Sequence, residues 1–270
     1  MRFQISFTSG TFENSGNAFS FVSKAINHRL TVVSSPISFP NGDWIESEVE
    51  VIKELSLNND NSFTAHDGID IDPIMYGNKA NRFTFARLQP FDVERIIIEF
   101  VDDSFFDLNK LLNEAALLKF NTAQLYDWNV ARWQSEMFPS NFKAENRDYE
   151  NRKLISHSMW TKRFGLTINI RENPGRDVLT HNMHIMAAPE MWFGPGCWAF
   201  FEIENILNCK EVLKVKEILP GVVYVKLFEP NTEDYETQEI LAKQKDFRIC
   251  SRMDEIEDFL NSRLSFPPAY

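Results

Sequence analysis

The sequence predicts an α+β protein with a mostly antiparallel sheet and helices packed on one side. Short segments with alternating apolar residues recur along the chain, bounded by Gly, Pro and Asn, which is typical of strands. Other segments repeat apolar residues at spacings of three and four, which is typical of helices. The 24 phenylalanines supply bulky side chains for the packing between these layers.

The first hundred residues predict most of the strands. Residues 2–8 (RFQISFT) alternate apolar and polar side chains, so we expect a strand with one buried face. Residues 30–33 predict a second strand, and residues 83–85 and 96–101 predict two more. Residues 45–57 also alternate, with apolar side chains on one face and acids on the other, and we interpret them as a long strand with an exposed acidic face.

Helices are predicted after this group of strands. Residues 104–118 carry one apolar stripe, with Ser104 as the N-cap and Asp107 three residues later. Apolar residues between 126 and 137 keep helical spacing and predict a second helix. Residues 141–158 then mix charges of both signs and contain few apolar residues. We therefore predict two α+β lobes, 1–140 and 159–270, joined by this connector, with a single compact domain as the alternative.

The second half is organised around residues 181–209. They predict a buried strand at 181–188, a turn at Gly194-Pro195-Gly196 and an amphipathic helix beyond it. Because glycine permits positive φ and has no Cβ, we expect one of the two glycines to be left-handed or otherwise closed to residues that carry a Cβ. With the strand predicted at 222–227, this order resembles a crossover unit. Residues 233–245 and 253–264 predict two helices at the end of the chain.

Composition restricts the function. The formal charge of −11 and the sequence pI near 5.0 disfavour nucleic acid and membrane surfaces as partners. The three cysteines form no CxxC pair, which indicates reduced thiols and a cytoplasmic location. The sequence contains no signal-peptide pattern, no membrane-span pattern and no phosphate-binding glycine motif. We expect no cofactor.

Two groups of residues could carry chemistry. His181, His184 and Cys197 could form a hydrolase or lyase site, since a cysteine nucleophile needs a neighbouring base. Residues three apart on a strand point to opposite faces, so the two histidines are not expected to share a metal. Asp70 and Asp72 are a weaker alternative as metal ligands, because Asp and Gly also dominate ordinary turns.

Acidic clusters instead favour a binding function. The leading interpretation is a non-enzymatic, acidic, cytoplasmic protein whose partner is a basic protein. A bacterial toxin-neutralising (immunity-type) role would suit this profile; the alternative is a hydrolase or lyase that uses the 181–197 region. Rows of acids are also common on solvated faces without a specific role. The candidate binding residues are Glu46, Glu48, Glu50, Asp254, Glu255 and Asp258.

Overall fold

A large antiparallel sheet forms the centre of the protein. The computed structural model describes residues 1–58, 60–67, 81–156 and 165–264. Within these ranges ten strands form one sheet in the order β13-β14-β12-β7-β1-β6-β5-β4-β2-β3, and each strand is antiparallel to its neighbours. The ten strands are β1 (Arg2–Thr8), β2 (Val32–Ser34), β3 (Asp43–Trp44), β4 (Ser62–His66), β5 (Arg82–Leu88), β6 (Val93–Glu99), β7 (Thr122–Tyr126), β12 (Glu190–Phe193), β13 (Lys214–Leu219) and β14 (Val222–Lys226).

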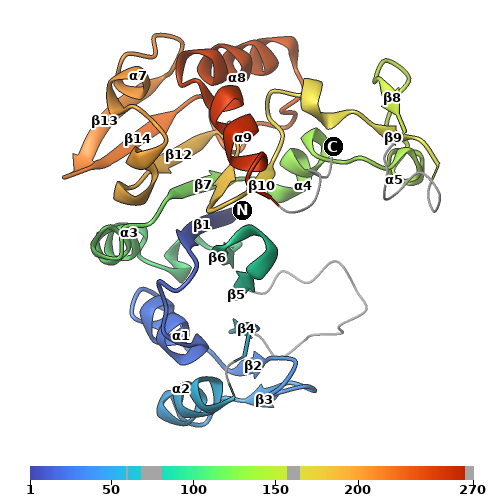
Figure 1. The fold of residues 1–270 in the computed structure, drawn as a ribbon. Helices are drawn as coiled ribbons and strands as arrows, with labels where there is room; N and C mark the ends of the chain where they lie inside the picture. The colour runs from blue at the N-terminus through green and yellow to red at the C-terminus, as the bar shows by residue number, and fades with distance from the viewer. Residues whose placement is uncertain (59, 68–80, 157–164, 265–270) are drawn as a thin grey trace.

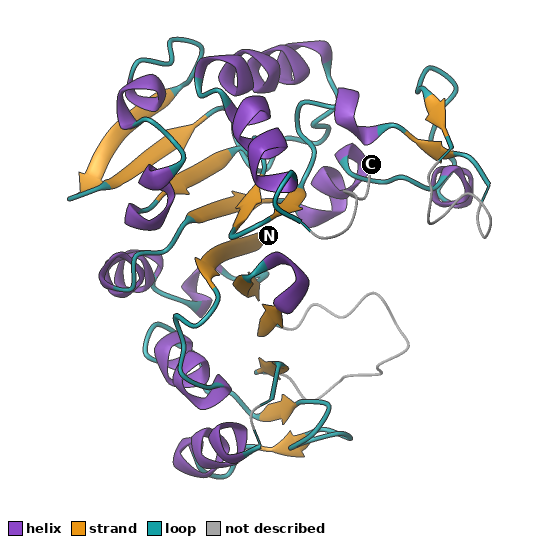
Figure 2. Ribbon diagram, in the orientation of Figure 1, coloured by secondary structure: helices purple, strands orange, loops and turns teal. Residues whose placement is uncertain are grey.

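Helices flank this sheet and two short hairpin-like pairs accompany it (Figure 2). The pairs are β8 (Leu154–Ile155) with β9 (Thr167–Ile168), and β10 (Val178–Thr180) with β11 (Met183–Ile185). The α+β class with a mostly antiparallel sheet is therefore confirmed. The α-helices of the described ranges are α1 (Ser15–Ser23), α2 (Glu48–Leu57), α3 (Leu108–Leu117), α4 (Trp128–Ala131), α5 (Pro139–Ala144), α7 (Ile203–Leu207), α8 (Gln238–Cys250) and α9 (Met253–Asn261).

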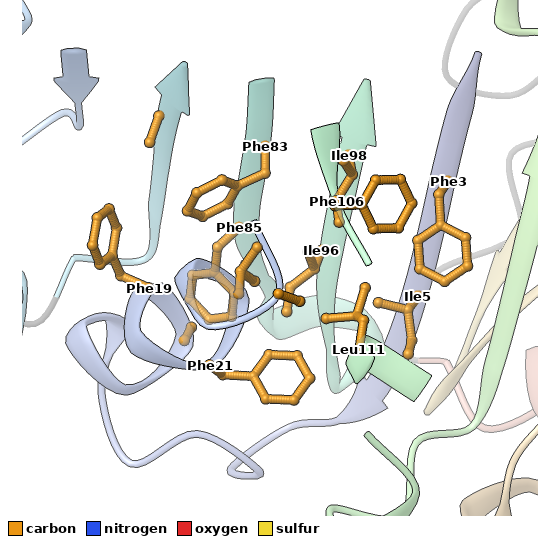
Figure 3. Packing of buried hydrophobic residues seen from close by; sticks show 14 of the residues in the cluster. Phe3, Ile5, Phe19, Phe21, Phe83, Phe85, Ile96, Ile98, Phe106 and Leu111 are labelled. Atoms are coloured by element: carbon orange, nitrogen blue, oxygen red, sulfur yellow. The ribbon is translucent and has the colours of Figure 1, made fainter. Parts of the chain in front are cut away.

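The two faces of the sheet carry separate hydrophobic clusters. β1, β5 and β6 direct phenylalanine and isoleucine side chains to one face, where α1 and α3 cover them (Figure 3). Side chains alternate along β12, so Trp192 joins this first cluster whereas Met191 and Phe193 join the second. Residues of α8 and α9 belong to the second cluster (Figure 1). Each half of the sheet thus has helices on one side, but the two halves use opposite faces.

Strands from both predicted lobes are neighbours in this sheet. β7, from the first predicted lobe, pairs with β12 from the second, with Gln124 opposite Met191 and Ala123 opposite Trp192. The division at residues 141–158 stays a prediction. No helix in the described part of the chain combines the length and the apolar character that a membrane crossing requires.

β1 lies in the middle of the sheet, which changes the environment of its polar side chains. The strand is where the sequence predicts it, between β6 and β7. Its polar residues Gln4 and Ser6 were expected on an exposed face, yet both are buried. The amide of Gln4 contacts His184 of β11, which covers this face of β1. A central position buries both faces of a strand, and only the tertiary pairing decides that position.

Residues 45–57 do not form the predicted long strand. The strand β3 ends at Trp44, before this segment, and α2 begins at Glu48 with Ser47 as N-cap. Val51 and Leu55, four residues apart, are buried, whereas Val49 and Leu57 of the same apolar set are exposed. Apolar residues at i and i+4 lie on one helix face. The sequence of this segment therefore fits both the strand period of two and the helix period of about 3.6, and the structure has the helix. A further helix, α1, lies between β1 and β2 and packs against α2.

Three other predicted segments differ in type or extent. The helix of 104–118 begins later, because Asp107 is the N-cap of α3 and Ser104 lies in the 3-10 helix η2 (Asp103–Phe105). The helix predicted between 126 and 137 is shorter, because β7 extends to Tyr126 and the helical residues are α4 and the 3-10 helix η3 (Arg132–Gln134). After Gly196 the chain forms the 3-10 helix η5 (Pro195–Ala199) and the short α7, and β12 pairs antiparallel with β14, so there is no crossover unit. The strand β14 and the two C-terminal helices are confirmed, with α8 starting at Gln238.

Gly194 and Gly196 are required for close packing, and neither has positive φ. Gly194 has φ −95°, and the glycines of the described residues with positive φ lie elsewhere. Their N–H groups donate to the carbonyl oxygens of Asn121 and Phe120, at 2.8 and 3.0 Å. A Cβ on Gly194 would lie 2.3 Å from the Phe120 oxygen, and one on Gly196 2.3 Å from the Lys119 oxygen. The left-handed alternative is wrong, whereas the other alternative, a position closed to any Cβ, holds for both glycines because the backbone of residues 119 and 120 lies so close.

Replacing Gly194 by alanine is expected to destabilise the protein by about 1–3 kcal/mol, because backbone must move to admit the methyl group. Chemical denaturation of Gly194→Ala and of a control, Pro195→Ala, measures this. The control changes the same turn without adding atoms. Its free energy of unfolding should fall by about 0.4–1 kcal/mol, because alanine gives the unfolded chain more conformational freedom than proline does. A Gly194→Ala protein as stable as the wild type would contradict the close-approach argument.

Candidate functional site

The acids Glu46, Glu48 and Glu50 form an exposed group where β3 ends and α2 begins. Within the described residues none of the three carboxylates takes part in an ion pair. Glu48 and Glu50 lie in the first turn of α2, where the helix dipole stabilises negative charge. Their exposure therefore agrees with the prediction, although it arises from a helix start and not from a strand face.

Large apolar side chains are exposed beside these acids. Trp44 of β3 is 61% exposed and Val49 of α2 is 75% exposed. β3 is the last strand of the sheet order, so this segment lies at one edge of the sheet. A hollow of about 310 Å³ adjoins β2, and its lining includes Ser34, Pro36 and Thr84. We call residues 43–50 the β3–α2 surface; it combines an aromatic side chain with unpaired carboxylates.

The second predicted acidic group is paired with arginines. Asp258 accepts hydrogen bonds from Arg171, both at 2.6 Å, and Glu255 pairs with Arg252. Asp254 Oδ1 lies 2.7 Å from both Arg176 Nη2 and Arg248 Nε. Each of these three acids of α9 is thus paired with at least one arginine, which offsets part of its charge.

The Asp254 pairs belong to a largely buried ion cluster. Arg176, Arg248 and Glu257 have side chains 4%, 2% and 1% exposed. Arg176 donates two hydrogen bonds to Glu257, at 3.2 and 2.9 Å, and Arg248 donates to the same carboxylate. Burial lowers the pKa of Arg248, and the neighbouring Arg176 lowers it further. Burial alone would raise the pKa of Asp254, but the charges of Arg248 and Arg176 bring it below its ordinary value.

His184 and Cys197 are core residues in this structure. His184 is fully buried, where Gln4 Nε2 lies 2.6 Å from its Nδ1 and Asp177 pairs with its Nε2. Burial raises the pKa of the Cys197 thiol well above its ordinary value, so the thiolate required of a nucleophile is disfavoured. Within the described residues the thiol has no hydrogen bond to His181 or to His184. His184 is thus hydrogen-bonded within the core.

Asp70 and Asp72 are the residues that the sequence offered as metal ligands. Asp70 and Asp72 lie outside the described residues. Among the residues that are described, no three His, Cys, Asp or Glu side chains converge in a way that could hold a metal ion.

The cysteines differ from the sequence prediction of three reduced thiols. Cys209, after α7, and Cys250, at the end of α8, form a disulfide across a sequence separation of 41 residues. Only Cys197 is a free cysteine. The pairing depends on the packing of two distant helices, so spacing alone gave no sign of it.

One group of polar residues was not recognised as a site in the sequence. His28, after α1, lies between Asp67, after β4, and Ser104 of η2. Asp67 fell in a segment interpreted as a turn, and Ser104 was interpreted as a helix N-cap. In the sequence Asp67 is 39 residues from His28 and Ser104 is 76 residues from it. Only the folding of three separate connections brings the three side chains together.

Comparisons of this chain with protein-family models, with curated proteins and with solved structures gave no match. The function is therefore argued from the geometry and charge of the described residues.

Proposed function

We propose that the protein binds a basic partner protein through the β3–α2 surface. The observation that carries this proposal is the row of exposed carboxylates at Glu46, Glu48 and Glu50, which have no ion pair within the described part of the chain. Unpaired like charges next to each other are unfavourable by themselves, and a cationic partner would relieve their repulsion. The acids of α9, which are already paired with arginines, do not share this property.

The neighbouring apolar side chains support a protein as the partner. Interfaces commonly combine a buried aromatic anchor with a charged rim. Trp44, 61% exposed, could supply the anchor, and the three glutamates the rim. A small metal ion would bind the carboxylates but would not bury the indole of Trp44. The surface therefore favours a basic protein over a metal ion.

A toxin-neutralising (immunity-type) role is the specific form of this proposal that the net charge of −11 supports, because a basic toxin would be attracted at long range. The proposal includes a cytoplasmic location. The Cys209–Cys250 disulfide speaks against that location, since disulfides persist mainly in oxidising compartments.

Charge reversal tests the β3–α2 surface. The variant Glu46→Lys/Glu48→Lys/Glu50→Lys should associate with the captured partner at least about tenfold more slowly than the wild type at low salt, because steering is lost. The dissociation rate should change less. Surface plasmon resonance against the partner isolated from native extract measures both rates, and the wild-type association rate should fall as salt shortens the Debye length from about 10 Å at 0.1 M.

A matched control changes the net charge equally at another place. Glu204, Glu211 and Glu233 are exposed and lie outside the β3–α2 surface. Their triple replacement by lysine should leave most of the association rate intact. Equal association rates for both triple variants and the wild type, at all salt concentrations, would show that the β3–α2 acids serve solubility alone.

A further inference from the structure

His28, Asp67 and Ser104 form a hydrogen-bonded row at the protein surface. Asp67 Oδ2 lies 3.0 Å from His28 Nδ1, and Ser104 Oγ lies 3.2 Å from His28 Nε2. The side chains of His28 and Asp67 are 30% and 16% exposed, and Ser104 is exposed. A hydroxyl, an imidazole and a carboxylate in this order are the constellation that activates serine nucleophiles on unrelated folds.

Neighbouring contacts hold the row in place. Asn81 Nδ2 donates to Asp67 Oδ2 at 2.9 Å, which orients the carboxylate toward the imidazole. Asn27 donates from its backbone N–H to the Phe105 oxygen and from its side chain to the Ser104 oxygen, at 2.8 and 2.9 Å. The Phe105 ring meets the His28 ring edge-on, with centroids 5.4 Å apart. The connection that carries His28 is thereby fixed to η2, which carries Ser104.

We propose that Ser104 is a nucleophile that His28 activates as general base, with Asp67 positioning the imidazole, and that the site cleaves carboxylic esters. In the first step His28 Nε2 takes the hydroxyl proton while Oγ bonds to the acyl carbon. The ester C–O bond breaks, and the proton passes from His28 to the departing alkoxide. Water then attacks the acyl-serine with the same histidine as base, which releases the carboxylic acid and restores Ser104.

Asp102 limits this activity and selects the substrate. Ser104 Oγ donates to Asp102 Oδ2 at 2.8 Å, so the hydroxyl has to rotate toward His28 before it can react. The Ser104 N–H donates to Asp102 Oδ1 at 2.8 Å and is not available to stabilise an oxyanion. These hydrogen bonds lower the pKa of the Asp102 carboxyl, which stays ionised. Its charge favours neutral or cationic esters over anionic ones.

Turnover is therefore expected to be slow. Loss of one oxyanion donor reduces the rate of serine hydrolases by about 10²–10³. Covalent modification of Ser104 is the more sensitive measure, because it needs only the nucleophile and its base. The experiment uses the full chain with two probes, a neutral fluorophosphonate and 4-nitrophenyl acetate, and peptide mass spectrometry to locate the modified residue.

We expect the wild-type protein to be phosphonylated and acetylated at Ser104. Ser104→Ala should lose both modifications, and His28→Gln should slow them by about 10²-fold or more. Ser140→Ala, which removes another exposed serine, should behave as the wild type. Absence of modification in the wild type, or modification elsewhere that survives in Ser104→Ala, would overturn the proposal. Thermal unfolding of each variant identifies any that fail to fold.

Further variants separate chemistry from structure. Asp102→Asn keeps an acceptor for the Ser104 N–H but removes the charge, so phosphonylation should become severalfold faster; a slower reaction would contradict the role given to Asp102. Asp67→Asn should slow phosphonylation, because the amide can turn its NH2 group toward His28 Nδ1 and no longer fixes the orientation of the imidazole. Asp67→Glu, which keeps the carboxylate, should restore part of the rate; equal rates for the wild type and Asp67→Asn would show that Asp67 has no positioning role.

Discussion

Replacing Glu257 by alanine is expected to destabilise the protein by about 3–5 kcal/mol, because two buried arginines lose their shared carboxylate. Arg176 and Arg248 are almost fully buried, and both donate to Glu257. Asp254 would remain beside them, but its side chain is 53% exposed and carries one negative charge for two guanidinium groups. The free energy of unfolding from urea denaturation measures the loss.

Asp258→Ala is the matched control for this variant. Asp258 is one residue further along α9 and pairs with Arg171, but the two side chains are 52% and 48% exposed. A pair in that environment contributes about 0–1 kcal/mol. The two variants remove the same kind of charge from the same helix, so they differ mainly in the burial of the carboxylate and in the number of arginines paired with it. Similar losses in both would mean that the Glu257 cluster is not closed to water.

Loss of the Cys209–Cys250 disulfide is expected to lower the free energy of unfolding by about 4 kcal/mol, because a cross-link over 41 residues restricts the unfolded chain. The double variant Cys209→Ser/Cys250→Ser and the wild type in the presence of reductant should show the same loss. Adding reductant to the double variant should change nothing further, which serves as its control.

Counting thiols tests the same disulfide independently. Protein purified without reductant and then denatured should contain one reactive thiol, from Cys197, and three after reduction. Three thiols before reduction would contradict the disulfide. That result would instead agree with the reduced cytoplasmic protein that the sequence predicts.

Local patterns predicted those elements in which one period dominates. The alternation of residues 2–8 identified β1, and the apolar stripe through Met253 and Leu260 identified α9. The strand prediction for residues 45–57 was wrong because their apolar residues fit a period of two and also, at Val51 and Leu55, a spacing of four. Burial against α1 is what favoured the helix, and the sequence does not state that contact.

The candidate sites show the same division. Exposure of Glu46, Glu48 and Glu50 followed from their polarity and did not depend on the type of element. The α9 acids resembled them in sequence, yet they are paired with arginines, of which Arg171 and Arg176 approach from distant segments. The His28, Asp67 and Ser104 row could not be predicted, because three separate connections supply one side chain each.

The sequence by itself determined the α+β class, the acidic charge and the apolar sets that alternate along strands such as β1 and β14, because these depend on side-chain type and short-range spacing. The tertiary structure decided the rest. It placed Gly194 against the carbonyl of Phe120, joined Cys209 to Cys250 and brought His28 between Asp67 and Ser104. Those contacts join residues more than 35 positions apart. They can stabilise the protein only after the chain has closed the loops between these residues.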